Sequence, residues 1–347
     1  MSPRSLLSRP AFRIPVVTVA ALGLLSACGS GSSDSASGPT VASMQLGWIA
    51  NVENAGPYVA LDKGYYEAEG IDMTVTPGGP SATVEPLVVS GKALVGLNSA
   101  DIVARAVAEG APLKIIAATL QNNPTTIMSL ADKPVNTLQD LAGKRLCVQT
   151  SGQSVINAVL TGNGMDPADV EMIPADFDPA PLVGGDCDAF VSLLNNQPLT
   201  LKAQGVETKT FLLSEYGYNA WGNVLFTTEE ALADDDSRKT LEGIVKATAK
   251  GWNDALSDTD AAAELMVTGP GKDQNLDLEQ QKLAMAEFTD LIKTPETETN
   301  GLLSMSAEGI AGNVETMQQI DVPGDDLASL FDTSILEAVY ADGPELS

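Results

Sequence analysis

Short apolar runs alternate with helical segments along most of this chain, and this alternation restricts the fold more than any other feature. Residues 71–76 alternate apolar and polar side chains, as a half-buried strand does. The segment before them, residues 57–69, has helical spacing and ends at Gly70, a frequent helix stop. Strands separated by helices pair in parallel, because a crossover returns the chain to the same end of the sheet. We therefore expect an α/β protein with parallel-rich sheets and covering helices.

The alternation runs through two cycles and is followed by a mostly helical segment. We expect strands at residues 43–48, 71–76, 93–97 and 114–120, then at 145–150, 170–174, 188–193, 211–213 and 223–227. Long helices are expected at 242–256 and 278–292. This order predicts two lobes with crossovers near residues 127–131 and 222–226: lobe I is 43–127 plus 226–347, and lobe II is 128–225. Ligands bind beyond the carboxyl ends of strands in open α/β sheets, so two such edges across a hinge would form a closing cleft.

The N-terminus resembles a bacterial lipoprotein signal. Three arginines precede a short apolar run at residues 14–25, which is too short for a stable transmembrane helix, and Cys28 follows small residues. The resemblance implies a signal peptide at residues 1–27, lipid on Cys28 and a flexible tether at 28–42. We expect a protein anchored on the extracytoplasmic face of the cell membrane. The alternative is an ordinary secretory signal with a chance cysteine.

The composition excludes several classes of function. The chain has 46 acidic and 19 basic residues, for a formal net charge of −27, so we expect no nucleic-acid partner. It has no histidine, which excludes Ser-His-Asp and Cys-His catalysis and His-based zinc sites. We expect no metal, no cofactor and a monomer. Besides Cys28, only Cys147 and Cys187 remain; a disulfide between neighbouring strands and two buried free thiols are both open.

Several ordered segments resemble one group of periplasmic binding proteins. Trp48-Ile-Ala-Asn51, then Ala55-Gly-Pro-Tyr58-Val-Ala60 and Lys63-Gly-Tyr-Tyr-Glu67, are similar to the start of these proteins. Leu138 to Gly143 resembles the entry to their second lobe. Asp188 to Gln197-Pro198, followed by Gly205, resembles the segment that carries Asn-Glu-Pro in the pyrimidine-type binders. The group includes nitrate, sulfonate and taurine binders and binders of thiamine-pyrimidine precursors and riboflavin.

The resemblance implies a type II periplasmic-binding-protein fold and a binding function. A small-molecule ligand and the transmembrane subunits of an ABC permease would be the partners. The group also contains a fungal enzyme that makes the thiamine pyrimidine with a histidine and a cysteine-rich iron motif. Asn54 occupies the position of that histidine and the cysteine run is absent, so we expect a binder and no enzyme.

The loops expected at the cleft contain no lysine or arginine, which disfavours an anionic ligand. They offer aromatic rings for stacking and amides that both donate and accept hydrogen bonds, and Glu53, Asp101, Asp176 and Asp178 would favour an amine. A neutral or weakly basic heteroaromatic nutrient is therefore the expected ligand. The candidate ligand-binding residues are Trp48, Asn51, Asn54, Tyr58, Ser99, Asp101, Gln121, Asn123, Ser151, Gln153, Ser154, Phe177, Asn196, Gln197, Tyr218, Asn219 and Trp221.

Three alternatives remain open. Helix N-termini after Ser99 and Gly152 would hold a sulfonate or nitrate without a basic side chain. Gln197 replaces the glutamate of the Asn-Glu-Pro segment, and a neutral amide cannot pair with a protonated aminopyrimidine as a carboxylate does. The second alternative is a pyrimidine-forming enzyme. The third is a sensor domain that presents its ligand to a membrane receptor.

Overall fold

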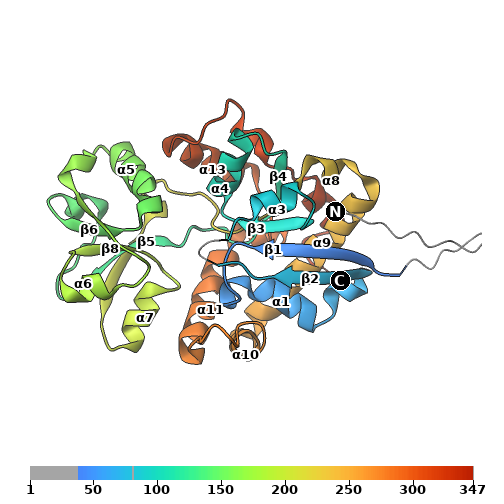
Figure 1. Ribbon diagram of the computed structural model, residues 1–347, viewed down its shortest axis with the longest axis horizontal. Helices are drawn as coiled ribbons and strands as arrows, with labels where there is room; N and C mark the ends of the chain where they lie inside the picture. The colour runs from blue at the N-terminus through green and yellow to red at the C-terminus, as the bar shows by residue number, and fades with distance from the viewer. Residues whose placement is uncertain (1–37, 80–81, 347) are drawn as a thin grey trace, which may run out of the picture. The chain divides into compact units, whose positions relative to one another are not determined.

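Lobe I is built on a five-stranded sheet with the strand order β2-β1-β3-β10-β4. The computed structural model describes residues 38–79 and 82–346 (Figure 1). The strands of this sheet are β1 (Thr40–Leu46), β2 (Ile71–Thr76), β3 (Val95–Asn98), β4 (Leu113–Ala118) and β10 (Val224–Thr228). β1 pairs in parallel with β2 and β3, whereas β10 runs antiparallel between β3 and β4. The amino end of β10 therefore lies at the carboxyl ends of its neighbours, where Val224 pairs with Asn98 and Ala118.

Lobe II repeats this pattern in the order β7-β6-β8-β5-β9. Its strands are β5 (Thr125–Leu130), β6 (Arg145–Val148), β7 (Glu171–Pro174), β8 (Ala189–Leu193) and β9 (Thr208–Leu212). β6 pairs in parallel with β7 and β8, and β5 runs antiparallel between β8 and β9. The chain enters this lobe through residues 119–124 and leaves it through residues 213–223, so both crossovers meet the sheets at the carboxyl ends of the parallel strands.

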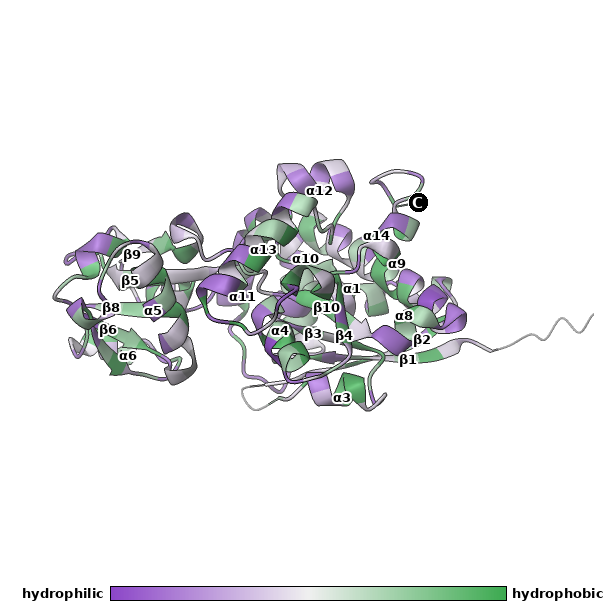
Figure 2. Cartoon of the chain, turned by 90° about the horizontal axis from the view of Figure 1, so that it is seen from above, coloured by the Kyte–Doolittle hydropathy of each residue, from purple (hydrophilic) through white to green (hydrophobic). Residues whose placement is uncertain are grey.

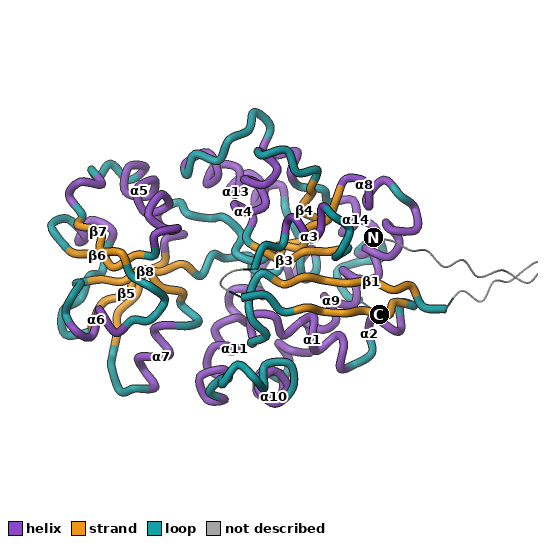
Figure 3. Tube along the Cα trace, in the orientation of Figure 1, coloured by secondary structure: helices purple, strands orange, loops and turns teal. Residues whose placement is uncertain are grey.

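Helices surround both sheets (Figure 3). Lobe I carries α1 (Ala55–Asp62), α2 (Tyr65–Ala68), α3 (Glu85–Val89), α4 (Ala100–Ala108), α8 (Glu229–Ala233), α9 (Asp235–Ser257), α10 (Thr259–Thr268), α11 (Leu278–Ile292), α12 (Pro295–Asn300), α13 (Ala307–Gln319) and α14 (Ser334–Val339). Lobe II carries α5 (Gln153–Gly162), α6 (Ala180–Gly184) and α7 (Gln197–Ala203). Short 3₁₀ helices are η1 (Val52–Asn54), η2 (Leu138–Leu141), η3 (Thr150–Gly152), η4 (Pro167–Asp169), η5 (Leu213–Tyr216) and η6 (Leu327–Leu330).

Helices α1 and α9 pack unusually closely in lobe I because glycines face each other at the contact. A Cβ atom on Gly251 would overlap the carbonyl oxygen of Gly56 and lie 2.8 Å from the Cβ of Ala60. The ring of Trp252 covers Gly56, and Trp252 is fully buried. Backbone contact of this kind excludes any larger side chain, so it fixes how α9 crosses α1.

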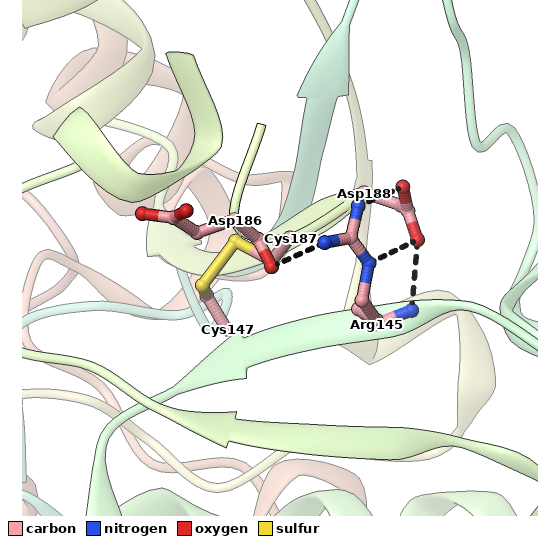
Figure 4. Close-up of polar contacts among 5 residues, drawn as sticks. All are labelled: Arg145, Cys147, Asp186, Cys187 and Asp188. Atoms are coloured by element: carbon pink, nitrogen blue, oxygen red, sulfur yellow. Dashed lines mark hydrogen bonds and ion pairs between the residues drawn. A yellow bond between two sulfur atoms is a disulfide. The ribbon is translucent and has the colours of Figure 1, made fainter. Parts of the chain in front are cut away.

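Lobe II contains a disulfide between Cys147 in β6 and Cys187, two residues before the start of β8 (Figure 4). Their Cα atoms are 5.7 Å apart, and both cysteines are buried with Met128, Leu182, Phe190 and Leu201 in a small apolar cluster. Beside it, the Arg145 guanidinium donates to the Asp188 carboxylate at 2.9 Å and to the Asp186 carbonyl at 2.8 Å. A covalent bond and an ion pair thus join the same two neighbouring strands.

The structure corrects several predicted boundaries. β1 begins at Thr40, inside the predicted tether of residues 28–42, because Thr40 already pairs with Ile71. The helix predicted at residues 57–69 is two helices, since Gly64 adopts a left-handed conformation with φ of +70° between them. The crossover predicted near residues 127–131 is mostly strand β5, so the predicted lobe boundaries at 127/128 and 225/226 fall inside β5 and β10.

Helix α12 is hydrophilic along its whole length (Figure 2). Within residues 38–79 and 82–346, no helix combines the length and the apolar character needed to cross a bilayer. The predicted signal peptide at residues 1–27 and the predicted lipid attachment at Cys28 lie outside the described residues.

Candidate functional site

The loops that follow β1 in lobe I and β7 in lobe II meet through an aromatic pair. The rings of Trp48 and Phe177 lie 5.8 Å apart between centroids, with their planes tilted by 59°. The lobes also touch between α11 and α7, where Gln280 Nε2 donates to Thr200 Oγ1 at 3.0 Å. Phe177 remains 51 % exposed despite its contact with Trp48. An exposed aromatic ring at the junction of two lobes offers a flat surface on which a ring-shaped ligand can stack.

A small cavity of about 170 Å³ lies at the same edge of lobe II. Its wall is mostly apolar, and the Ser192 hydroxyl is a buried polar group without a hydrogen-bond partner there. Such a group costs free energy until it meets a donor or acceptor, and a ligand can supply one. The lining residues are Thr125, Gln149, Gly152, Val155, Ile156, Phe177, Val191, Ser192, Leu193, Gln197 and Tyr218.

Two glutamines hold the cavity wall in place. Gln197 Oε1 accepts from the Leu193 N–H at 2.9 Å, and its Nε2 donates to the Phe177 carbonyl at 3.3 Å. Gln149 Nε2 donates to the carbonyls of Asp176 and Val191, both at 3.3 Å. Gln197 therefore positions the loop that carries Phe177, a role for which a neutral amide suits better than a carboxylate because it must both donate and accept.

Glu53 occupies the corresponding edge of lobe I. Its Oε1 accepts from Asn223 Nδ2 at 3.4 Å, and the Asn223 carbonyl accepts from the Thr119 N–H at 2.8 Å. Thr119 follows β4 and Asn223 precedes β10, so the carboxyl group lies where both crossovers meet the sheet. Burial raises the pKa of Glu53 to about 7, and the weak bond from Asn223 offsets only part of that shift.

Most of the candidate amides have their hydrogen-bonding groups engaged within the fold. Asn51 Oδ1 accepts from the Glu53 N–H at 3.1 Å and thereby caps η1. Gln121 Nε2 donates to the carbonyls of Ala118 and Ser304 at 2.9 and 3.0 Å. Asn123 ties the two crossovers together, because its Nδ2 donates to the Ala220 carbonyl. Asn54 is buried and donates to the Ile49 carbonyl at 3.0 Å, which leaves its Oδ1 without a partner.

The structure places Trp221 in the core of lobe I and thus corrects its expected stacking role. Its side chain is 2 % exposed, its ring meets Phe331 edge-on at 5.7 Å, and it packs on Gly309. Tyr58 is likewise buried, in α1, where burial raises its pKa to about 12. Tyr218 does line the cavity; burial, aided by the nearby Asp101 carboxylate, raises its pKa above the usual range.

The remaining candidates lie at helix starts and in loops around the cleft. Ser99 precedes α4 without capping it, Ser151 lies in η3, and Gln153 begins α5. Ser154 and Asn219 are exposed, and Asn196 is half-buried at the start of α7. The sequence interpretation missed the apolar wall of the cavity and three of its polar side chains, Thr125, Gln149 and Ser192. Thr125 lies two residues after the candidate Asn123, whereas Ser192 lies within strand β8 and gave no local signal.

The described residues contain no group of three histidine, cysteine or carboxylate side chains that could hold a metal ion. The chemistry along these edges consists of aromatic faces, neutral amides, hydroxyls and carboxyl groups. Such a set can bind and orient an organic molecule.

Comparisons with known proteins identify the family of this chain. A model of the family described as NMT1/THI5 like matches residues 51–262. The riboflavin-binding protein RibY of Chloroflexus aurantiacus is 25 % identical over 266 residues, which are 75 % of each chain. The formylaminopyrimidine-binding protein of Halalkalibacterium halodurans is 26 % identical over 264 residues, covering 74 % of this chain and 78 % of that protein.

A pyrimidine phosphate synthase of Schizosaccharomyces pombe matches a smaller part, with 26 % identity over 45 % of each chain. Among solved structures, the periplasmic aliphatic sulphonate binding protein SsuA of Escherichia coli superposes with a TM-score of 0.64. It is 16 % identical, and the match covers 81 % of this chain and 86 % of SsuA. The chain therefore belongs to the NMT1/THI5-like family and has the periplasmic binding protein fold.

Proposed function

We propose that this protein is the extracytoplasmic substrate-binding component of an ABC importer. In this proposal it captures a small heteroaromatic nutrient, similar to a thiamine-pyrimidine precursor or a flavin, and delivers it to a membrane permease. Lipid on Cys28 would hold a monomeric protein at the membrane. The names of two relatives, a riboflavin-binding and a formylaminopyrimidine-binding protein, support this ligand class.

One observation carries the proposal: an exposed aromatic ring, Phe177, borders a mostly apolar cavity and meets Trp48 of the other lobe. A planar ligand that entered there would contact both lobes at once. Its binding free energy would then favour the closed arrangement of the lobes, which a permease can distinguish from the empty protein. The absence of histidine and of a cysteine cluster argues against the pyrimidine-forming enzyme.

Thermal unfolding of the soluble chain from Gly29 onward tests the ligand class. A ligand well above its dissociation constant raises the melting temperature by mass action, so we expect a shift with an aminopyrimidine or riboflavin. Phe177→Ala should weaken that binding about tenfold or more, because it removes the exposed stacking face. Val183→Ala is the matched control, since Val183 is also an exposed apolar residue of lobe II but does not line the cavity.

Two other results would redirect the assignment. A shift with ethanesulfonate or nitrate alone would favour an oxyanion held by helix N-termini. Conversion of a bound pyrimidine to a new product, followed by mass spectrometry, would contradict the binding-only function.

A further inference from the structure

Glu53 has an unusual position for a carboxyl group. It lies in η1, five residues after Trp48, and reaches Asn223 at the start of β10. Asn223 is in turn bonded to the backbone of Thr119 at the end of β4. Glu53 thus lies beside the ends of β4 and β10, the side of such sheets on which ligands bind.

The described part of the chain provides no charge that balances this carboxyl group. Its single hydrogen bond, from Asn223, is long at 3.4 Å, and it forms no ion pair. Burial and Asn223 are the influences on its pKa, and no charged side chain of the packed helices α1, α10 or α11 contributes. Glu53 is half-buried, and carboxylates that are partly withdrawn from water normally have a cation or several donors as partners.

Two further acceptors nearby in the chain also have no partner. Asn54 Oδ1, on the next residue, and Thr119 Oγ1, beside Asn223, belong to side chains that are each 1 % exposed. Buried polar atoms in folded proteins usually have hydrogen-bond partners, so these two unmet groups add to the unbalanced polar character of the chain around Glu53.

We propose that Glu53 is a specificity-determining residue that selects ligands with a cationic amine or an amino group. This inference rests on the proposed function and names the chemistry of its ligand: the flat ring contacts Trp48 and Phe177, and a nitrogen donor of the ligand meets Glu53. Asn223 positions the carboxylate. The residue rejects sulfonates and other anions by charge repulsion.

Calorimetric titration with a matched pair of probes tests this selection. The probes are 4-amino-2-methylpyrimidines with either an aminomethyl or a hydroxymethyl group at carbon 5, and ethanesulfonate is the anionic comparison. Wild-type protein should bind the aminomethyl probe about tenfold more tightly than the hydroxymethyl probe. Glu53→Gln should abolish that preference. Glu67→Gln, which removes the same charge from an exposed position of α2, should retain it.

A preference that survives in Glu53→Gln would overturn the selection by Glu53 while the transport function stands. Tighter binding of ethanesulfonate than of both pyrimidines would overturn it as well. If no probe binds, the proposed ligand class is wrong. The state of the Glu53 carboxyl group can then still be measured without a ligand. A carboxyl carbon NMR titration that places Glu53 at an ordinary glutamate pKa would contradict an unmet carboxyl group, and a value near 7 would support it.

Discussion

The two lobes share one strand order, but they are stabilised in different ways. Lobe I is assembled from two distant chain segments and covered by many helices, with α1 and α9 in direct backbone contact at Gly56 and Gly251. Lobe II is one continuous segment with few helices, and a disulfide and an ion pair join its neighbouring strands. Smaller bodies bury a smaller fraction of their surface, and covalent cross-links compensate for this. Close helix packing therefore stabilises lobe I, and a covalent cross-link between strands stabilises lobe II.

Removing the disulfide should have the largest effect on stability, and this effect should be confined to lobe II. Closing a loop with a sequence separation of 40 residues contributes about 4 kcal/mol in the chain-entropy model. We expect Cys147→Ala with Cys187→Ala to destabilise lobe II so that it unfolds before lobe I. Differential scanning calorimetry should then show two transitions. One unshifted transition would contradict a stabilising role, and wild-type protein under reducing conditions is the control.

Replacing Glu53 should have the next largest effect, and it should depend on pH. The folded pKa of about 7 lies above the ordinary 4.5, so wild-type stability falls as the pH rises from about 4.5 through 7. Glu53→Gln has no such loss. Between pH 4 and pH 8, its free energy of unfolding should therefore rise relative to that of the wild type by up to about 3 kcal/mol. Urea unfolding at both pH values measures this difference. Parallel pH profiles of the two proteins would contradict it.

Gly251→Ala tests the close packing of lobe I. Its Cβ would overlap the Gly56 carbonyl, so α9 would have to shift, at a cost of about 1–3 kcal/mol. Gly312→Ala is the matched control in α13, where the nearest atom to the new Cβ is 3.9 Å away and alanine should stabilise the helix. Equal unfolding free energies for the two variants would show that the α1–α9 contact yields easily.

The Arg145–Asp188 pair should have the smallest effect, because both side chains are more than one-third exposed. The hydrogen bonds from Arg145 lower the pKa of Asp188, so its stabilising contribution is present above about pH 4 and lost as the pH falls through the lower folded value. Asp188→Asn should reduce the melting temperature slightly at pH 7 and leave it unchanged at pH 2. A larger decrease in melting temperature than the disulfide variant shows would contradict the ranking of these two contacts.

Local sequence signals predicted several elements closely. Residues 71–76 and 278–292 form a strand and a helix with the expected bounds, because alternation is strong in the first and Asp277 caps the second. α9 begins earlier than expected, at Asp235, since Asp234 accepts from the Ser237 N–H at 2.9 Å and caps it. That cap was readable in the sequence as an acidic run before the helix.

Other features depend on residues that are distant in the sequence. β5 lacks alternation because it lies inside a sheet between β8 and β9, so its pattern did not identify a strand. Trp221 is a core residue because Gly309 and Phe331, which follow it by about ninety residues or more, pack on its ring. Glu53 was recognised as acidic, but its burial and its contact with Asn223 follow only from the assembled sheet. The ligand-binding roles of Trp48 and Phe177 remain predictions.

The place of β10 has a consequence for the order in which the protein folds. This strand lies inside the lobe I sheet, yet it follows the whole of lobe II in the chain, and Val224 pairs with Asn98. A chain that emerges N-terminal end first can complete lobe II while lobe I still has a gap between β3 and β4. Pairings over such long separations close slowly. As the chain is synthesised, the edge of lobe I that contains Asn98 and Val224 would therefore be completed after lobe II.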